Sequence, residues 1–310
     1  MREAFQSASF YAESRKTIEQ ANKIIAKYQA QGYTLTLRQL YYQFVSLGLV
    51  ENSQKNYKRI GDLLNKARLA GLVDWDAIED RTRWLRSIPT YKTPLQFLKR
   101  ATEGYAEQLW SEQETYCEVW IEKDALIGVI ERTCNAWRVP YFPCRGYASQ
   151  SEMYEAGQRF KRKLTQHQRV VVFHLGDHDP SGIDMSRDND DRLNMFANSF
   201  IEVRRLALNM DQVETYNPPE NPTKETDSRH VGYYEQFGDD ASSWELDALS
   251  PEVINDLVDE AIKEIVDIDL YREKEAAETA NRDRIRSHVD NFGKELTLPY
   301  GLDLDADYLW

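Results

Sequence analysis

Cysteine is scarce in this chain, and its three residues, Cys117, Cys134 and Cys144, show neither close pairing nor the spacing of metal ligands. This pattern argues against a disulfide framework and a zinc site, and it is typical of reduced, buried thiols in an intracellular protein. Long apolar runs are also missing, since no stretch approaches the roughly 18 residues that span a membrane. The N-terminal segment lacks the apolar core of a signal peptide. We therefore expect a cytoplasmic protein without a membrane partner.

Positive charge is in deficit overall but not everywhere. The 310 residues carry a formal net charge of −13, whereas residues 1–105 hold 17 Lys and Arg against 10 Asp and Glu. Residues 106–310 hold 22 basic side chains against 42 acidic ones. A basic N-terminal part joined to an acidic C-terminal part suggests that the first part contacts phosphate groups. We interpret the acidic part as solvated surface, a cation site or both.

The N-terminal part predicts three amphipathic helices. Residues 12–30 carry apolar side chains at helical spacing, and a second helix is expected over 37–48 with Thr36 as its N-cap. A third helix is expected from about residue 53 to 70, with one apolar face. Three consecutive helices of this length fit a small DNA-binding module or a plain three-helix packing unit.

A short strand over 72–78 and a wing or turn over 79–85 are expected next, which completes the pattern of a winged helix-turn-helix domain. The third helix is then the candidate reader of a DNA groove. Its candidate DNA-binding side chains are Lys55, Lys58, Arg59 and Lys66. The alternative is a three-helix packing unit whose basic face is merely solvated.

At this length the chain has room for about two domains. We expect a winged-helix domain over 1–94, a linker helix over 95–114, with its helical residues at about 95–111, and an α/β domain over 115–310. Towards the C-terminus the sequence predicts a loop over 217–232. A further helical region is expected from Ser250 to about residue 290.

The α/β domain is predicted from alternating strand and helix patterns. A first strand ends at Glu122, a helix covers 125–137, and a short strand lies within 139–146. A helix over 150–164 then begins at a Ser-x-x-Glu capping box, and an apolar strand starts at residue 169. This β-α-β-α-β order predicts a parallel, doubly wound sheet.

Three acidic residues follow strands of this predicted sheet. Glu122 ends the first strand, while Asp177 and Asp179 follow the third. The carboxyl ends of parallel strands meet at one edge, where open α/β sheets bind ligands, and carboxylate oxygens suit Mg²⁺. The alternative is a strand followed by an ordinary polar turn. Lys123, next to Glu122, is interpreted as a surface residue, with a phosphate contact as the alternative.

Two sets of motifs carry a family resemblance. WIEKDAL at the first strand, PCRGYAS at the second and LGDHDPSG at the third resemble the Toprim domain. TLRQLYYQFV at 36–45 resembles the Arg-x-x-Tyr/Phe-Tyr helix of the topoisomerase VI A-subunit and meiotic double-strand-break protein family. With the helix through VRRLALNMDQVETYNPP and the segment WELDALSP, the resemblance extends from about residue 15 to 255. The chain is short for that family and is most similar to its compact, standalone members.

The resemblance implies a winged-helix domain followed by a Toprim domain, acting on double-stranded DNA. Tyr42 is implied as the nucleophile that forms a 5′-phosphotyrosyl link, with Arg38 one helical turn away to clamp the scissile phosphate. Glu122, Asp177 and Asp179 are implied as the ligands of Mg²⁺. A homodimer is also implied, with each Tyr42 acting beside the carboxylates of the other protomer. Whether an ATPase partner exists is left open by the resemblance.

Two other functions compete with this interpretation. The chain could be a metal-dependent Toprim nuclease of the plasmid-defence type, in which activated water attacks DNA and Tyr42 is structural. It could also be a non-catalytic DNA-binding regulator on the same scaffold. All three place it at the nucleoid of a prokaryote, or with a phage or plasmid.

Overall fold

The computed structural model describes most of the chain. The described residues are 2–78, 88–166, 168–221, 227, 229–238 and 242–295, with side chains through Phe292. The wing or turn predicted over 79–85 lies outside these residues. The chain divides into two compact units, of which one comprises residues 1–84 and 114–265 and the other 85–113 and 266–310.

The three predicted N-terminal helices are confirmed. They are α1 (Ala12–Ala30), α2 (Leu37–Ser46) and α3 (Gln54–Leu69). Thr36 caps α2, since its hydroxyl accepts from the Gln39 N–H while the Gln39 side chain accepts from the Thr36 N–H. The helices enclose one apolar core, which includes Ile18, Ala21, Leu40, Phe44, Ile60 and Leu64.

The strand predicted over 72–78 is wrong. A short 3-10 helix, η1 (Trp75–Ala77), stands there instead, and only Ile78 forms an isolated bridge, to Leu35. The cause is Arg68 on α3, which donates hydrogen bonds of 2.6 and 3.2 Å to the carbonyl groups of Trp75 and Ile78. These carbonyl groups therefore have partners without a neighbouring strand.

The predicted parallel α/β sheet is confirmed. Its strands are β1 (Thr115–Ile121), β2 (Tyr141–Pro143), β3 (Arg169–Leu175) and β4 (Glu202–Ala207). They pair in the order β2-β1-β3-β4, with every pair parallel. All of β1 and all of β3 beyond Arg169 are buried, as expected of strands covered on both faces.

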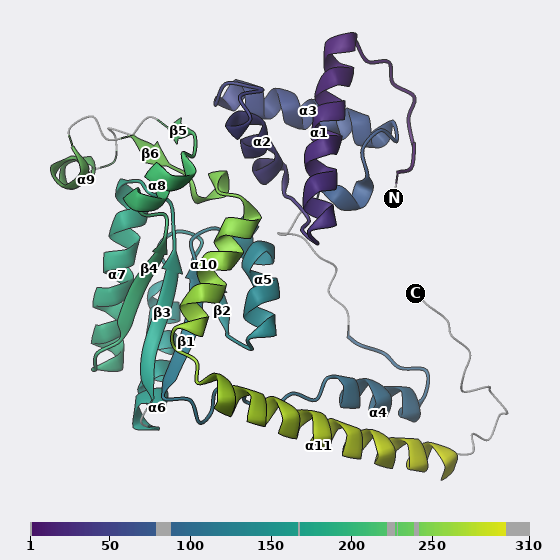
Figure 1. Cartoon of the computed structure of the whole chain (residues 1–310), viewed down its shortest axis with the longest axis vertical. Helices are drawn as coiled ribbons and strands as arrows, with labels where there is room; N and C mark the ends of the chain where they lie inside the picture. The colour runs from purple at the N-terminus through teal and green to yellow at the C-terminus, as the bar shows by residue number, and fades with distance from the viewer. Residues whose placement is uncertain are drawn as a thin grey trace. The chain divides into compact units, whose positions relative to one another are not determined.

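Helices cover both faces of this sheet. They are α5 (Ile127–Ala136), α6 (Gln150–Thr165), α7 (Pro180–Ala197) and α10 (Pro251–Lys263). Helix α5 packs against α10 and α6 against α7, and Figure 1 shows α7 and the α5–α10 pair on opposite sides of the strands. The predicted caps are confirmed, since the Ser149 and Ser250 hydroxyls accept from the Glu152 and Val253 N–H groups.

The segment after β4 approaches the carboxyl end of β3. It contains α8 (Met210–Tyr216), β5 (Glu220–Asn221), α9 (His230–Phe237), β6 (Ser243–Trp244) and η3 (Leu246–Ala248). The loop predicted over 217–232 is therefore wrong in part, because β5 pairs antiparallel with β6. An isolated antiparallel bridge joins His178 to Trp244. This bridge brings the residues after β6 beside Asp177.

The second unit is built on two helices, α4 (Pro94–Glu103) and α11 (Ile268–Glu295), which pack together (Figure 1). Helix α4 is shorter than the predicted 95–111. It ends at Glu103, and Gly104, a residue type that disfavours helix interiors, is its C-cap. Trp110 packs edge-on against Tyr271, with ring centroids 6.2 Å apart. In the described part of the chain, no helix is both long and apolar enough to cross a membrane.

Candidate functional site

Glu122 and Asp177 meet where β1 and β3 end. The Glu122 N–H donates to the Leu175 carbonyl at 2.8 Å, and the Asp177 N–H donates to Glu122 Oε2 at 2.9 Å. Burial raises the pKa of the Glu122 carboxyl and raises that of Asp177 well above its usual range, although Lys123 acts in the opposite direction on both. The sheet thus holds two interacting carboxyl groups at one edge.

The turn after β3 is tight and leaves no room for a side chain at Gly182. A Cβ atom there would lie 2.1 Å from the Asp177 carbonyl oxygen. Arg205 of β4 donates to the carbonyl groups of Asp177 and Gly182 at 2.6 and 2.9 Å. Burial lowers the pKa of Arg205 to about 10, against the effect of the neighbouring carboxylates. Arg205 therefore fixes the backbone that presents Asp177.

Asp179 serves as the N-cap of α7. Its Oδ1 accepts from the Gly182 N–H at 2.6 Å and from the Ser181 hydroxyl at 2.9 Å. One of its two oxygens is thus committed to the helix end. Asp179 and Asp177 both line a small cavity of about 90 Å³, together with Asn221, Asp227 and Glu245.

Lys123 is buried in the site, so its interpretation as a surface residue is wrong. Its side chain is 18% exposed and contacts Asp177 at 2.6 Å, Asp247 at 3.5 Å, and Glu245. Burial alone would lower the pKa of Lys123, but these three carboxylates raise it above its ordinary value. Lys123 is therefore the central cation of a cluster of carboxylates.

Arg38 joins the same cluster from α2, which packs against η3. Its Nη2 lies 2.7 Å from Glu245 Oε2, and its Nε lies 2.5 Å from Asp247 Oδ2. Burial opposes the charge on Arg38, but the Asp247 and Glu245 carboxylates raise its pKa. The contact joins the N-terminal helices to the edge of the sheet. We refer to Arg38, Lys123, Asp177, Glu245 and Asp247 as the charge cluster.

Tyr42 lies beside this cluster. Its side chain is 5% exposed, and the guanidinium carbon of Arg38 lies 5.7 Å from the centre of its ring. Burial raises the pKa of the Tyr42 phenol and the Glu245 charge adds to this, while Arg38, Asn221 and Lys123 act to lower it. The phenol is therefore neutral at neutral pH.

Tyr41 has a different environment from its neighbour. Its hydroxyl accepts from the Ser53 N–H at 2.8 Å and lies 3.0 Å from the Ser53 carbonyl oxygen, to which it can donate. It thereby fixes the start of α3 within the core, as expected for a structural tyrosine. Of the two adjacent tyrosines, Tyr42 is the one that lies at the charge cluster.

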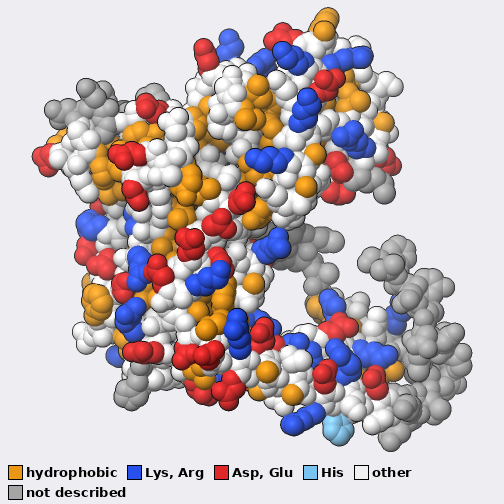
Figure 2. Space-filling model, in the orientation of Figure 1, with side chains coloured by type: hydrophobic (Ala, Val, Ile, Leu, Met, Phe, Trp, Pro, Cys, Tyr) orange, Lys and Arg blue, Asp and Glu red, His pale blue; other side chains and the backbone are white. Residues whose placement is uncertain are grey.

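The candidate DNA-binding side chains of α3 are exposed. Lys55, Lys58, Arg59 and Lys66 are all accessible to solvent. None of them forms an ion pair with a described residue. Figure 2 shows Lys and Arg side chains on the N-terminal helices interspersed with acidic and hydrophobic ones, so the visible face is not uniformly basic.

The three predicted metal ligands lie near one another at the sheet edge, but their side chains are not arranged as a metal centre in this structure. Carboxylate oxygens suit Mg²⁺, but Asp177 is paired with Lys123 and Asp179 is engaged by the end of α7. Over the described residues, no group of three His, Cys, Asp or Glu side chains is arranged to hold a metal ion. The side chains as they stand therefore do not fit a three-carboxylate metal centre.

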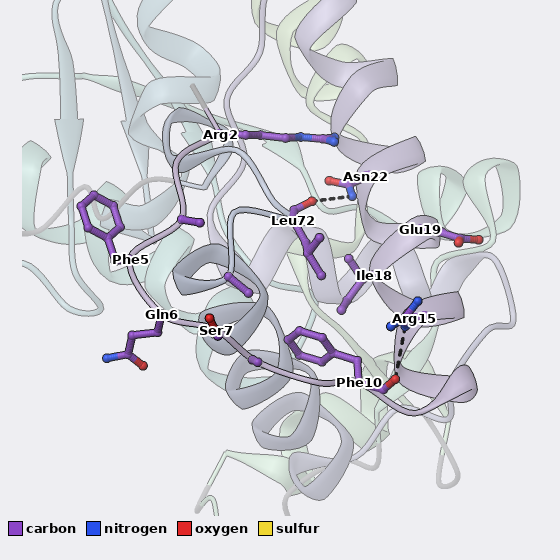
Figure 3. A pocket seen from close by; sticks show the side chains of 13 residues that line it. Arg2, Phe5, Gln6, Ser7, Phe10, Arg15, Ile18, Glu19, Asn22 and Leu72 are labelled. Atoms are coloured by element: carbon purple, nitrogen blue, oxygen red, sulfur yellow. Dashed lines mark hydrogen bonds between the residues drawn. The ribbon is translucent and has the colours of Figure 1, made fainter.

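A larger hollow lies away from the cluster, between the N-terminal segment and α1 (Figure 3). It has a volume of about 670 Å³ and is lined by Arg2, Phe10 and Arg15 among others. Two of its polar side chains bond to backbone carbonyl groups, since Arg15 donates to the Phe10 carbonyl and Asn22 to the Leu72 carbonyl. No acidic and basic side chains converge there as they do in the charge cluster.

Glu245 and Asp247 were missed by sequence reasoning as site residues. The one available signal was WELDALSP, in which the two acids alternate as Asp177 and Asp179 do. Comparisons of the chain with family models, curated proteins and solved structures found no match. The interpretation of the site therefore depends on its own residues and geometry.

Proposed function

We propose that this chain binds double-stranded DNA and cleaves it by transesterification, with Tyr42 as the nucleophile. The observation that carries the proposal is the contact of α2 with the sheet edge. It brings Tyr42 and Arg38 to the same cluster as Lys123 and Asp177, which come from distant parts of the sequence. A hydroxyl nucleophile, two cations and carboxylates in one site are what phosphodiester transfer requires.

In the proposed reaction, the Tyr42 oxygen attacks a backbone phosphorus and loses its proton. The bond from phosphorus to the 3′ oxygen breaks, and that oxygen leaves as a hydroxyl after it gains a proton. Arg38 and Lys123 stabilise the negative charge that develops on the phosphoryl oxygens. Dependence on Mg²⁺ stays a prediction of the family resemblance and is tested by adding or omitting the ion.

The decisive test is cleavage of supercoiled plasmid in the presence of Mg²⁺, stopped with detergent and divided into samples with and without protease. We expect linear DNA whose migration or recovery depends on protease, because a protein remains attached to each 5′ end. Tyr42→Phe should remove the adduct but retain DNA binding. Adducts that persist in this variant would contradict the role of Tyr42.

One observation favours hydrolysis by a metal-dependent nuclease as a second candidate. Burial and Glu245 raise the pKa of the Tyr42 phenol, which disfavours the phenolate needed for attack. In that case Tyr42 is structural, and the same experiment gives cleaved DNA with free ends in both samples. Tyr42→Phe would then retain cleavage.

The homodimer with shared sites is part of the proposal and has its own test. Within one chain Arg38, beside Tyr42, already contacts the carboxylates of the cluster. Mixing Tyr42→Phe and Asp177→Asn subunits distinguishes the arrangements. Sites shared between protomers regain activity in the mixed dimer, because one site is then intact, whereas sites within one chain stay inactive.

A further inference from the structure

One carboxylate oxygen in the charge cluster contacts both cations. Glu245 Oε2 lies 2.7 Å from Arg38 Nη2 and also contacts Lys123 Nζ. Arg38 comes from α2 and Lys123 from the end of β1, so the two cations converge from different elements. A single anionic oxygen held by one guanidinium and one ammonium group is also how proteins hold a phosphate.

Asp247 holds the same two cations but has a different environment. Its side chain is fully buried, whereas the side chain of Glu245 is 25% exposed. Asp247 Oδ2 lies 2.5 Å from Arg38 Nε and 3.5 Å from Lys123 Nζ. Asp247 therefore positions the cations from the interior of the protein, whereas Glu245 contacts them on the side that solvent reaches.

The contacts of the Glu245 carboxylate also allow its side chain to move away from Arg38 and Lys123. Its carboxylate contacts the side chains of Lys123, Arg38 and Asp177, and within the described chain no backbone N–H donates to it. Asp177, in contrast, accepts from the Leu246 N–H at 2.8 Å. The Glu245 side chain can thus rotate away without leaving a backbone donor unpaired, and an external anion can take its place.

We propose that Glu245 occupies the binding site of a phosphodiester group, and that a DNA phosphate exchanges with its carboxylate on Arg38 and Lys123. Asp247 stays in place as the positioning residue for both cations. This inference rests on the proposed function for the identity of the ligand, but the anion site itself is defined by the cluster. The resting chain is accordingly self-blocked, because Glu245 occupies the two cations that the phosphate requires.

The test compares Glu245→Gln with the wild-type chain, using a 20-base-pair duplex without Mg²⁺ so that no cleavage occurs. We expect the variant to bind the duplex about tenfold more tightly, because the phosphate no longer competes with an internal carboxylate. Orthophosphate should compete with the duplex at lower concentration in the variant. Glu264→Gln is the matched control, since Glu264 pairs with Arg204 on an exposed surface.

Each outcome bears on one proposal. Unchanged or weaker duplex binding by folded Glu245→Gln, with unchanged competition by orthophosphate, overturns the phosphate site even if Tyr42 adducts form. Tighter binding without adducts in the plasmid experiment supports the site and contradicts transesterification. Stronger competition by orthophosphate without tighter duplex binding shows a site for free phosphate and overturns the exchange with DNA.

A second variant covers the case in which Glu245→Gln does not fold. Glu245→Asp keeps the charge but shortens the side chain, which withdraws the carboxylate from the two cations. We expect a smaller increase in duplex affinity, in the same direction. No increase in a folded Glu245→Asp variant would overturn the proposal.

Discussion

Two buried ionic groups of this protein differ in how completely their charges are satisfied. On β1, Glu118 accepts from both arms of Arg159, at 2.7 and 3.0 Å, and from the Tyr116 hydroxyl and the Trp120 indole N–H. One carboxylate there has one cation and four donors. In the charge cluster, three carboxylates share Arg38 and Lys123.

The difference extends to the hydrogen bonds. Both side-chain oxygens of Asp247 are buried, and neither has a hydrogen-bonding partner of good geometry in the described chain despite the ion pair with Arg38. A fully satisfied pair of charges stabilises a fold and has no capacity for a further ligand. A cluster with surplus negative charge and weakly directed contacts can exchange partners. We therefore assign structure to the Glu118 group and function to the charge cluster.

The largest expected effect comes from Tyr42→Phe, which tests whether the cluster performs chemistry. Removing the nucleophilic oxygen should lower the yield of covalent DNA adduct by about a thousandfold or more, since no neighbouring hydroxyl replaces it. Adduct is measured by denaturing gel after the plasmid reaction. Tyr41→Phe is the matched control, and it should retain the adduct while losing about 1 kcal/mol of stability through the contacts with Ser53.

The second-largest expected effect is a loss of stability in the Glu118 group, which consists of Glu118 and its donors Arg159, Tyr116 and Trp120. Arg159→Ala leaves a buried carboxylate without its cation and should lower the free energy of unfolding by about 3 kcal/mol. Denaturant titration measures this loss, with Arg162→Ala as the control because Arg162 is exposed on the same helix. Equal stability of the two variants would show that the Glu118 group is not the closed structural pair described above.

Falling pH should act through His174 of the sheet before it acts through Glu245 of the cluster. Burial lowers the pKa of His174 to about 3 from its usual 6.5, so the unfolded chain binds a proton through this window while the folded chain does not. His174 should therefore lower the stability by about 2 kcal/mol between pH 7 and pH 5. His178, whose pKa burial lowers to about 4, should add to the decline over the same range.

Within the cluster, Glu245 should lose its charge only in stronger acid. Burial would raise the pKa of Glu245, but Lys123 and Arg38 lower it to about 2, so its contribution is present above the usual pKa and is lost as the pH falls from about 4.5 to 2. His174→Asn, whose amide imitates Nδ1 beside Ser186, should make the slope of the stability profile between pH 7 and 5 shallower, while His178 maintains part of it. An unchanged slope in this variant would contradict the assignment to His174.

The smallest expected effect is that of Asp247→Asn on stability. Because the cluster has more carboxylates than cations, losing one should change the free energy of unfolding by about 1 kcal/mol or less. Duplex binding should nevertheless weaken, since Arg38 and Lys123 lose their common anchor. A loss of stability as large as that of Arg159→Ala would show that the two ionic groups do not differ in kind.

Local rules in the sequence predicted much of the fold. The N-caps Thr36, Ser149 and Ser250 act within one helical turn, and the apolar run of β3 needs no distant partner to be recognised. The strand over 72–78 could not be excluded in this way, because Arg68 reaches its carbonyl groups from another helix.

The candidate site was predictable only where it follows from strand order. Glu122 and Asp177 meet because β1 and β3 are parallel neighbours, which the sequence pattern implies. Lys123 was misjudged because the carboxylates of Glu245 and Asp247 reach it from a segment far along the chain. The sequence around Lys123 contains no pattern that predicts these contacts.

The closeness of Gly182 to the Asp177 carbonyl oxygen limits how this sequence can change during evolution. A carboxylate of this site can be replaced by an amide without loss of the fold. The acidic residues are therefore free to change in descendants that have lost the activity. A side chain at Gly182 instead requires the whole turn to be rebuilt. Distant descendants of this chain, active or not, should therefore be recognisable by a glycine five residues after the position of Asp177.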